Sequence, residues 1–212
     1  MKKSIALFVF VGAGVAAMAQ NVAEIFVNDK NVSHEIWLSG SLQDSSRVSF
    51  FNYTRFRVDY ESTSANEFMS YSTVNYEIMK GLGVATGGFI LNSGFVPVVA
   101  LNYFYQNETW LINVFPSVEL AENPNKEVFL FLQYRPQLNE RLRLFSQLVY
   151  NTNFTFERHN FSEQNLRLGL EYRSLQFGVG GDITQVPFED PEASRVNISW
   201  NFNFGVFLRK EF

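Results

Sequence analysis

The chain has 212 residues, of which 46% are hydrophobic and 17% aromatic, and its formal net charge at pH 7 is −4. This acidic balance argues against nucleic acid as a partner, because proteins that bind nucleic acid need a basic surface. The sequence contains no cysteine, which excludes disulfide bonds, zinc–thiolate sites and cysteine nucleophiles.

The N-terminus has the three parts of a secretory signal peptide. Lys2 and Lys3 form a basic region, residues 5–17 are almost entirely apolar, and Ala17-Met18-Ala19 offers a cleavage site before Gln20. The alternative is an anchoring helix, but the apolar run is shorter than the roughly 20 residues that a membrane span needs. We therefore expect residues 1–19 to be a cleaved signal peptide and residues 20–212 to form a single domain of an exported protein.

From Ser33 onward, apolar and polar residues alternate in stretches that are separated by turn residues. Successive side chains of a strand point to opposite faces, so each stretch predicts a strand with one apolar and one polar face. A helical period is absent outside the signal peptide. The alternation predicts about eleven clear strands. They cover residues 36–42, 48–60, 68–78, 82–90, 95–105, 110–120, 128–134, 142–154, 166–172, 175–183 and 196–212.

Short and longer connections follow each other along the chain. The short ones are residues 80–81, 106–108, 139–140 and 173–174, and the longer ones are 61–66, 121–126, 156–163 and 185–194. Outer-membrane barrels have short periplasmic turns and longer external loops. This orientation requires one more strand at the start, for which the weak segment 22–28 is the only candidate. We therefore predict about 12 strands, or about 10 if two of them merge.

The last stretch, residues 196–212, alternates most regularly and ends on Phe212. It resembles the C-terminal strand of bacterial outer-membrane β-barrel proteins, which the barrel-assembly machinery reads during biogenesis. The resemblance covers the whole mature chain as an architecture and identifies no functionally characterised family. Two positions depart from the pattern, since Lys210 replaces a second terminal aromatic residue and Phe207 stands where glycine is often found. The implied assembly signal consists of Trp200, Phe202, Phe204 and Phe212.

These observations predict an all-β fold, an antiparallel up-and-down transmembrane β-barrel in the outer membrane of a bacterium. We expect the protein to be a monomer that is surrounded by outer-membrane lipid. We expect no cofactor, and no metal, because His34 and His159 are the only histidines and no further ligand pattern accompanies them.

If the apolar parity faces lipid, the other parity faces the lumen. The predicted lumen-lining residues are Arg55, Arg57, Glu77, Arg135, Arg143, Arg167 and Glu171. Aromatic residues of the same parity would fill part of this space, namely Phe51, Tyr53, Phe129, Phe131 and Phe145. A barrel of about 12 strands is narrow, because wide aqueous channels appear at about 16 strands. We therefore expect a narrow passage or a mostly filled interior.

The favoured function is a narrow, porin-like channel for small solutes or a structural surface protein, without catalysis. A first alternative is a lipid-active outer-membrane enzyme that uses His159 and Ser162, although their spacing has no motif character. A second alternative is a soluble exported β-barrel that binds an apolar ligand. In that case the apolar parity would face inward and the arginine parity would face water.

Overall fold

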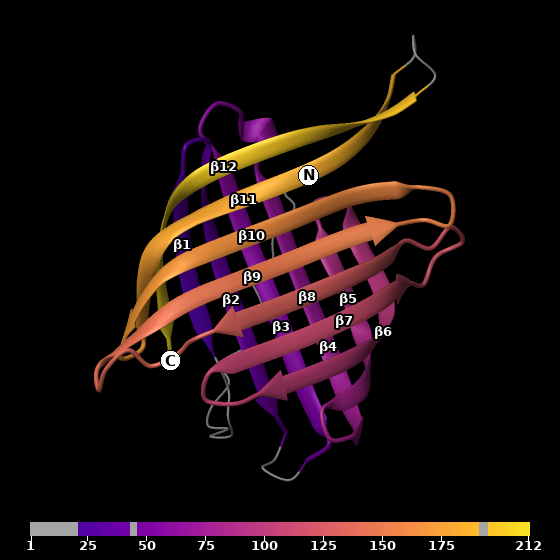
Figure 1. Cartoon of the computed structure of the whole chain (residues 1–212). Coiled ribbons are helices and arrows are strands. Elements are labelled where there is room, and N and C mark those ends of the chain that lie inside the picture. Colours follow the sequence, from indigo (N-terminus) through magenta and orange to yellow (C-terminus); the bar gives the residue numbers. More distant parts are fainter. Residues whose placement is uncertain (1–20, 43–45, 191–194) are drawn as a thin grey trace, which may run out of the picture.

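The computed structural model describes residues 21–42, 46–190 and 195–212, so the predicted signal peptide lies outside the described residues. In these residues, twelve antiparallel strands form a closed barrel in which β1 pairs with β12 (Figure 1). Each strand pairs with its neighbours in sequence, which is the predicted up-and-down topology. The strands are β1 (Val22–Asn28), β2 (Asn31–Ser41), β3 (Val48–Asp59), β4 (Glu67–Met79), β5 (Leu82–Leu91), β6 (Gly94–Gln106), β7 (Trp110–Glu119), β8 (Lys126–Tyr134), β9 (Leu142–Phe154), β10 (His159–Tyr172), β11 (Leu175–Asp190) and β12 (Arg195–Glu211).

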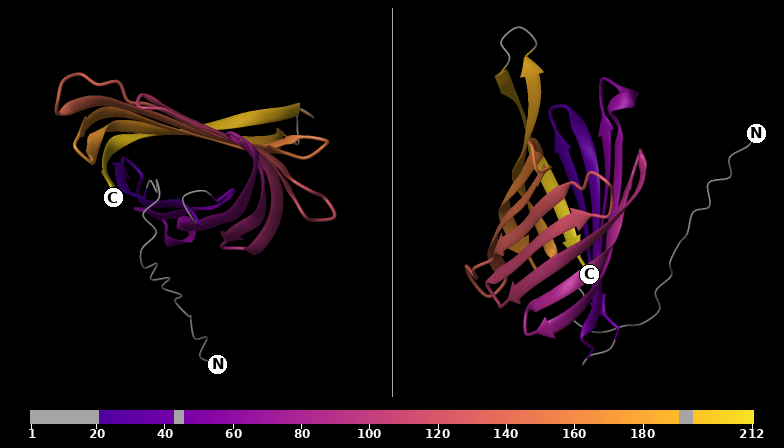
Figure 2. Two further views of the ribbon diagram at one scale, coloured as in Figure 1. Left: turned by 90° about the horizontal axis from the view of Figure 1, so that it is seen from below. Right: turned by 90° about the vertical axis from the view of Figure 1, so that its right-hand side faces the viewer.

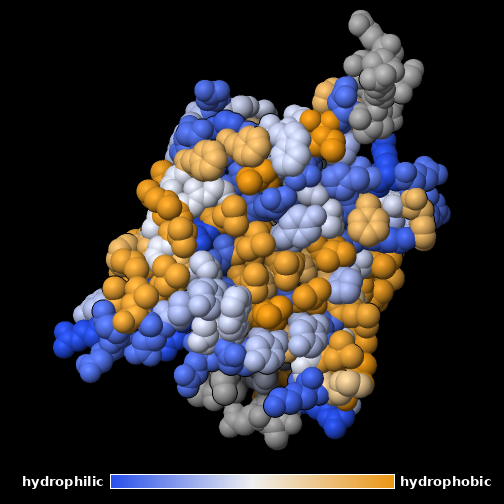
Figure 3. All heavy atoms as spheres, in the orientation of Figure 1, coloured by the Kyte–Doolittle hydropathy of each residue, from blue (hydrophilic) through white to orange (hydrophobic). Residues whose placement is uncertain are grey.

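The alternation of each strand decides which side chains face out. In β12, Trp200, Phe204 and Leu208 are 52%, 66% and 51% exposed, whereas Phe207 and Arg209 are each 3% exposed. The face of the barrel shown in Figure 3 carries a band of apolar side chains with hydrophilic residues above and below it. The apolar parity therefore faces outward, which contradicts the alternative of a soluble barrel with an apolar interior.

The two ends of the barrel differ. One end, which we call the terminal end, holds Asn21 and Phe212, and the Phe212 amide donates to the Asn21 carbonyl at 2.8 Å. The opposite end, which we call the loop end, holds the connections after β1, β3, β5, β7 and β9. Within the described residues, no helix has the length and apolar character needed to cross a membrane. The only helical segment in this part of the chain is η1 (Thr63–Ala65).

Three predicted connections are wrong in length. The strand β10 begins at His159, and β11 continues to Asp190, so residues 159–163 and 185–190 are strand and not loop. Pro187 fits in β11 because pairing with β10 ends at Gln185, which leaves this edge free. Conversely, the connection between β8 and β9 spans residues 135–141, longer than the two residues predicted.

The barrel is flattened in cross-section. Seen from below, the wall of β1 to β5 and the wall of β8 to β12 face each other as two curved layers (Figure 2). They join through β6 and β7 on one side and through the β12–β1 pair on the other. Inward side chains of the two layers therefore meet across the interior and determine how much of it stays open.

Candidate functional site: the barrel interior

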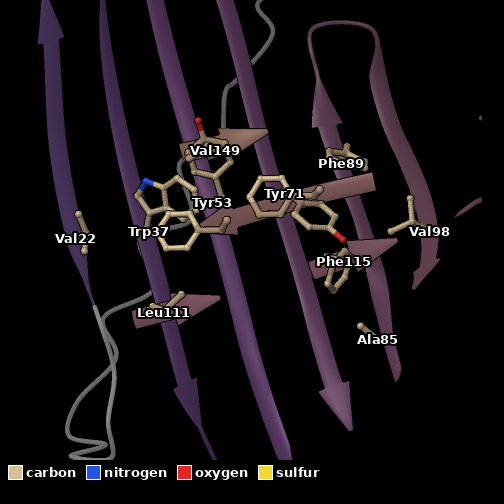
Figure 4. Packing of buried hydrophobic residues seen from close by; sticks show 12 residues of the cluster. Val22, Trp37, Tyr53, Tyr71, Ala85, Phe89, Val98, Leu111, Phe115 and Val149 are labelled. Atoms are coloured by element: carbon tan, nitrogen blue, oxygen red, sulfur yellow. The ribbon is translucent and has the colours of Figure 1, made fainter. Parts of the chain in front are cut away.

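An aromatic cluster bridges the two walls of the barrel (Figure 4). Trp37 of β2 lies with its ring centroid 5.0 Å from Phe131 of β8, and Tyr71 of β4 lies 5.6 Å from Phe115 of β7. Both contacts join strands that are not neighbours in the sheet. Aromatic rings thus fill the interior between these strands, as the aromatic residues of inward parity predicted. The aromatic cluster consists of Trp37, Tyr53, Tyr71, Phe89, Phe115, Phe129 and Phe131.

A second set of side chains, which we call the charged column, runs beside the aromatic cluster from the loop end to the terminal end. Its members come from β1, β3, β4 and β10 to β12, and from the residue that follows β8. Ion pairs and amide hydrogen bonds link them in two groups, from Glu67 to Arg209 and from Gln176 to Arg135. The charged column consists of Glu67, Arg57, Arg55, Glu163, Asp182, Arg167, Glu24, Arg209, Gln176, Glu171, Glu211 and Arg135.

At the loop end, two arginines of β3 share one carboxylate of β10. Arg55 Nη1 and Arg57 Nη2 donate to the same Glu163 oxygen at 2.9 and 2.8 Å. Arg57 also contacts Glu67 at 3.1 Å, and the Glu67 side chain is 52% exposed. This carboxylate connects the buried pair to solvent at the rim. Charge-assisted bonds of this length are the strong kind, because both partners are ionised.

At mid-height, one arginine is held between two carboxylates. Arg167 Nε donates to Glu24 at 2.8 Å and its Nη1 donates to Asp182 at 2.9 Å. Asp182 also lies 3.9 Å from Arg57, and Glu24 lies 3.5 Å from Arg209. The side chains of Arg167 and Glu24 are each 1% exposed. Charges buried to this degree are tolerated only when they are paired.

At the terminal end, the charged column again has one arginine between two carboxylates. Arg135 Nη1 lies 3.4 Å from Glu171 and 3.0 Å from Glu211. Gln176 donates to Glu171 at 3.0 Å and lies opposite Arg209 in the register of β11 with β12. The charged column therefore consists of two bonded groups, Glu67 to Arg209 and Gln176 to Arg135, which the strand register places side by side.

Five of the seven predicted lumen-lining residues belong to the charged column: Arg55, Arg57, Arg135, Arg167 and Glu171. The other two lie outside it. Arg143 donates to the Glu108 carbonyl at 2.9 Å, at the terminal end. Glu77 is exposed, beside a register shift between Glu77 and Met79 that ends the regular ladder of β4 with β5.

Three members of the charged column were not among the lumen-lining residues predicted from the sequence, namely Glu24, Glu163 and Arg209. Glu24 lies in β1, which is too short for a strong alternation signal, and Glu163 was assigned to a loop. Arg209 follows the inward parity of β12, so the alternation alone would have selected it. For Glu163, the available signal was a carboxylate at a position of polar parity. Such a carboxylate can pair with the arginines of β3 across the barrel.

His159 and Ser162 do meet, at the loop end of β10. His159 Nε2 lies 2.7 Å from Ser162 Oγ, and Ser162 Oγ donates to Thr152 Oγ1 at 2.8 Å. Which of the two donates in the His159–Ser162 bond depends on the histidine tautomer. Ser162 is only 3% exposed. A serine nucleophile must reach its substrate, and this burial keeps the hydroxyl away from one.

The residues of the implied assembly signal all lie on the outside. Trp200, Phe202, Phe204 and Phe212 are 52%, 45%, 66% and 74% exposed. Their role in assembly stays a prediction. Among the described residues, no group of three or more His, Asp or Glu side chains is placed to hold a metal ion.

No family model matches the chain, and no curated protein matches it in sequence. Among solved structures, the NanC porin superposes with a TM-score of 0.51 at 8% identity, over 92% of this chain and 99% of the NanC chain. The fold is that of an outer-membrane β-barrel. This likeness is one of fold, and the location in a bacterial outer membrane stays a prediction.

Two further solved structures are similar to this chain at a lower TM-score. The KdgM porin, solved with disordered oligogalacturonate, has a TM-score of 0.47 at 8% identity, over 91% of this chain and 99% of the KdgM chain. An outer membrane channel from Pseudomonas putida F1 has the same TM-score and identity, over 98% of this chain and 100% of that chain.

Proposed function

We propose that this protein is a narrow outer-membrane channel for small polar solutes, and that the charged column is its path. The observation that carries the proposal is the sharing of partners along the charged column. Glu163 is shared by two arginines, Arg167 by two carboxylates, and Arg135 by two more.

Shared partners matter because they permit exchange. Breaking an isolated buried ion pair leaves a bare charge, at a cost of about 3–5 kcal/mol. Where one group has two partners, a passing ion or polar solute can replace one of them while the other remains. Rings and rows of charge select ions in pores by the same substitution of partners. The two bonded groups of the charged column place such exchange sites at both rims and at mid-height.

The aromatic cluster sets the size of the solute. Rings from opposite walls meet at mid-height, so the cross-section open to solutes is smaller than that of an empty barrel of 12 strands. We therefore expect inorganic ions and small polar molecules to pass, and larger ones such as oligosaccharides to be excluded. The NanC structure, with its TM-score of 0.51, is named a porin, and channel activity agrees with that name.

We infer that the protein is not an enzyme. The burial of Ser162 supports this inference, because a serine nucleophile must reach its substrate and this side chain is only 3% exposed. A filled barrel that serves as a structural surface protein is the competing function. It would have the same aromatic cluster and the same ion pairs but no conductance.

The test begins with the location and fold of the expressed protein. Recovery in the outer-membrane fraction, together with an SDS gel mobility that changes on boiling, would identify a folded barrel. Purified protein of this state is then inserted into a planar lipid bilayer under a KCl gradient. We expect small, discrete conductance steps. Well-inserted protein that shows no steps would leave the structural surface protein as the function.

A variant separates the charged column from any other leak. Glu163→Gln removes one negative charge between Arg55 and Arg57, so the reversal potential is expected to move toward that of chloride. The matched control is Glu122→Gln, which removes an exposed carboxylate from the loop after β7. Equal reversal potentials for both variants would contradict the assignment of the path.

A further inference from the structure

The outer face of the barrel carries a group of polar side chains on β3 and β4. Asn52 faces Ser72 across the two strands, and Thr54 faces Ser70. Asn52 Nδ2 donates to Ser72 Oγ at 2.8 Å and to Ser70 Oγ at 3.2 Å. Thr54 Oγ1 donates to Asn52 Oδ1 at 3.1 Å. We call these four residues the outward polar cluster.

The outward polar cluster lies within the apolar band, not at a rim. On one side the same two strands carry Phe56 and Phe68, whose ring centroids are 6.0 Å apart. On the other side they carry the facing pair Phe50 and Val74, which are 41% and 54% exposed. Apolar pairs that face lipid therefore border the cluster in both directions along the strands.

Hydrocarbon chains offer no hydrogen-bond partner, so polar groups that face them must be satisfied within the protein. The cluster meets this condition only in part. The Ser72 hydroxyl accepts the Asn52 amide, and its own hydrogen donates to no acceptor in the part of the chain that the structure describes. Ser72 is also exposed. An unused donor thus points toward lipid, beside the Asn52 oxygen, which can accept a second bond.

We propose that the outward polar cluster is the contact between two copies of this chain in the membrane. Its four side chains are neutral, and each both donates and accepts hydrogen bonds, so the cluster is complementary to itself. In a contact with two-fold symmetry, each Ser72 hydroxyl donates to the Asn52 oxygen of the other copy, and the reverse bond follows by symmetry. Polar and small side chains join transmembrane segments in this way.

The proposal departs from the monomer that the sequence suggested, and it is independent of channel activity. The short side chains of the cluster lie between larger ones, Phe50 and Phe56 on the same strand. Two barrels can therefore approach closely at this point, while the flanking aromatic residues of both copies pack around the polar contact.

Cross-linking in native outer membranes tests the contact, because the chain has no cysteine of its own. A Val74→Cys variant keeps all four side chains of the cluster, because Val74 is the next lipid-facing residue after Ser72 on β4 and is 54% exposed. It is oxidised in isolated membranes, and the products are separated without reductant. We expect a disulfide-linked band at twice the mass of one chain. The matched control is Leu168→Cys on β10, whose lipid-facing side chain is 55% exposed on the opposite wall. It is expected to give less than a tenth of that band.

A second substitution tests the chemistry of the contact. Adding Asn52→Leu to Val74→Cys is expected to reduce the cross-linked band to the Leu168→Cys level, while the boiling-dependent gel mobility shows that the barrel still folds. A band no stronger than the Leu168→Cys control in the single Val74→Cys variant would overturn the proposal. Cross-linking to a protein of a different mass would do so as well, because the occupant would then not be a second copy.

Discussion

Arg167 donates a hydrogen bond to Glu24 at 2.8 Å, although 143 residues separate them in the chain. Arg167 lies on β10 and Glu24 on β1, and the two strands β11 and β12 lie between them in the closed sheet. The pair exists only because β1 closes the barrel against β12. It also holds the centre of the charged column.

Replacing Arg167 is expected to destabilise the barrel strongly. Arg167→Met leaves the Glu24 and Asp182 carboxylates buried without their main partner, at a cost of about 3–5 kcal/mol. The free energy of unfolding is measured by urea titration of the barrel folded into lipid vesicles. Arg143→Met is the control, since that guanidinium donates to a backbone carbonyl at the terminal end. The importance of the buried pair is contradicted if both variants lose the same stability.

Opening the aromatic cluster is expected to enlarge the conductance. Trp37→Ala removes the ring that contacts Phe131 across the barrel, and large-to-small changes in a packed core cost about 3–5 kcal/mol. The variant is therefore expected to be less stable and to show larger single-channel steps. Trp200→Ala removes an outward ring, 52% exposed, and should leave the steps unchanged. Unchanged steps in Trp37→Ala would show that the cluster does not limit the path.

Closure of the barrel is expected to depend on Gly205. A Cβ at Gly205 would lie 2.0 Å from the Val27 carbonyl oxygen and 2.7 Å from the Asn28 Cα, so it would force β12 away from β1. We expect Gly205→Ala to abolish the boiling-dependent mobility shift of the folded barrel.

Gly181→Ala is the matched control for Gly205→Ala, one strand away. Its Cβ would meet the Phe204 ring at 3.2 Å, and a side chain can shift where a backbone cannot. This variant is expected to retain the mobility shift. A folded Gly205→Ala barrel would mean that the β1–β12 pair tolerates a wider spacing.

The C-terminal residue is expected to act in assembly and not in stability. Phe212→Ala should lower recovery in the outer membrane severalfold, because it removes the terminal aromatic of the implied assembly signal. The same variant folded into vesicles should unfold at the wild-type urea concentration. Phe95→Ala, which removes another outward aromatic with 64% exposure, is the control for recovery. Equal recovery of the two variants would remove the assembly role from Phe212.

The alternation of residues determined much of this protein without any structure. A period of two is a local property, so it identified the strands and the face on which Arg55, Arg57 and Arg167 lie. The same parity placed Phe129 and Phe131 inside the barrel and Trp200 outside. Local patterns failed where strands are short or extend past their neighbours, as in β1 and at the start of β10, because pairing with adjacent strands decides those boundaries.

Only the tertiary structure decided which inward residues meet. Register between strands brought Arg55 and Arg57 to Glu163, and barrel closure brought Glu24 to Arg167. Flattening of the barrel brought Trp37 against Phe131 from the opposite wall. These contacts depend on the registers of all the strand pairs around the closed sheet. A local stretch of sequence does not determine those registers together.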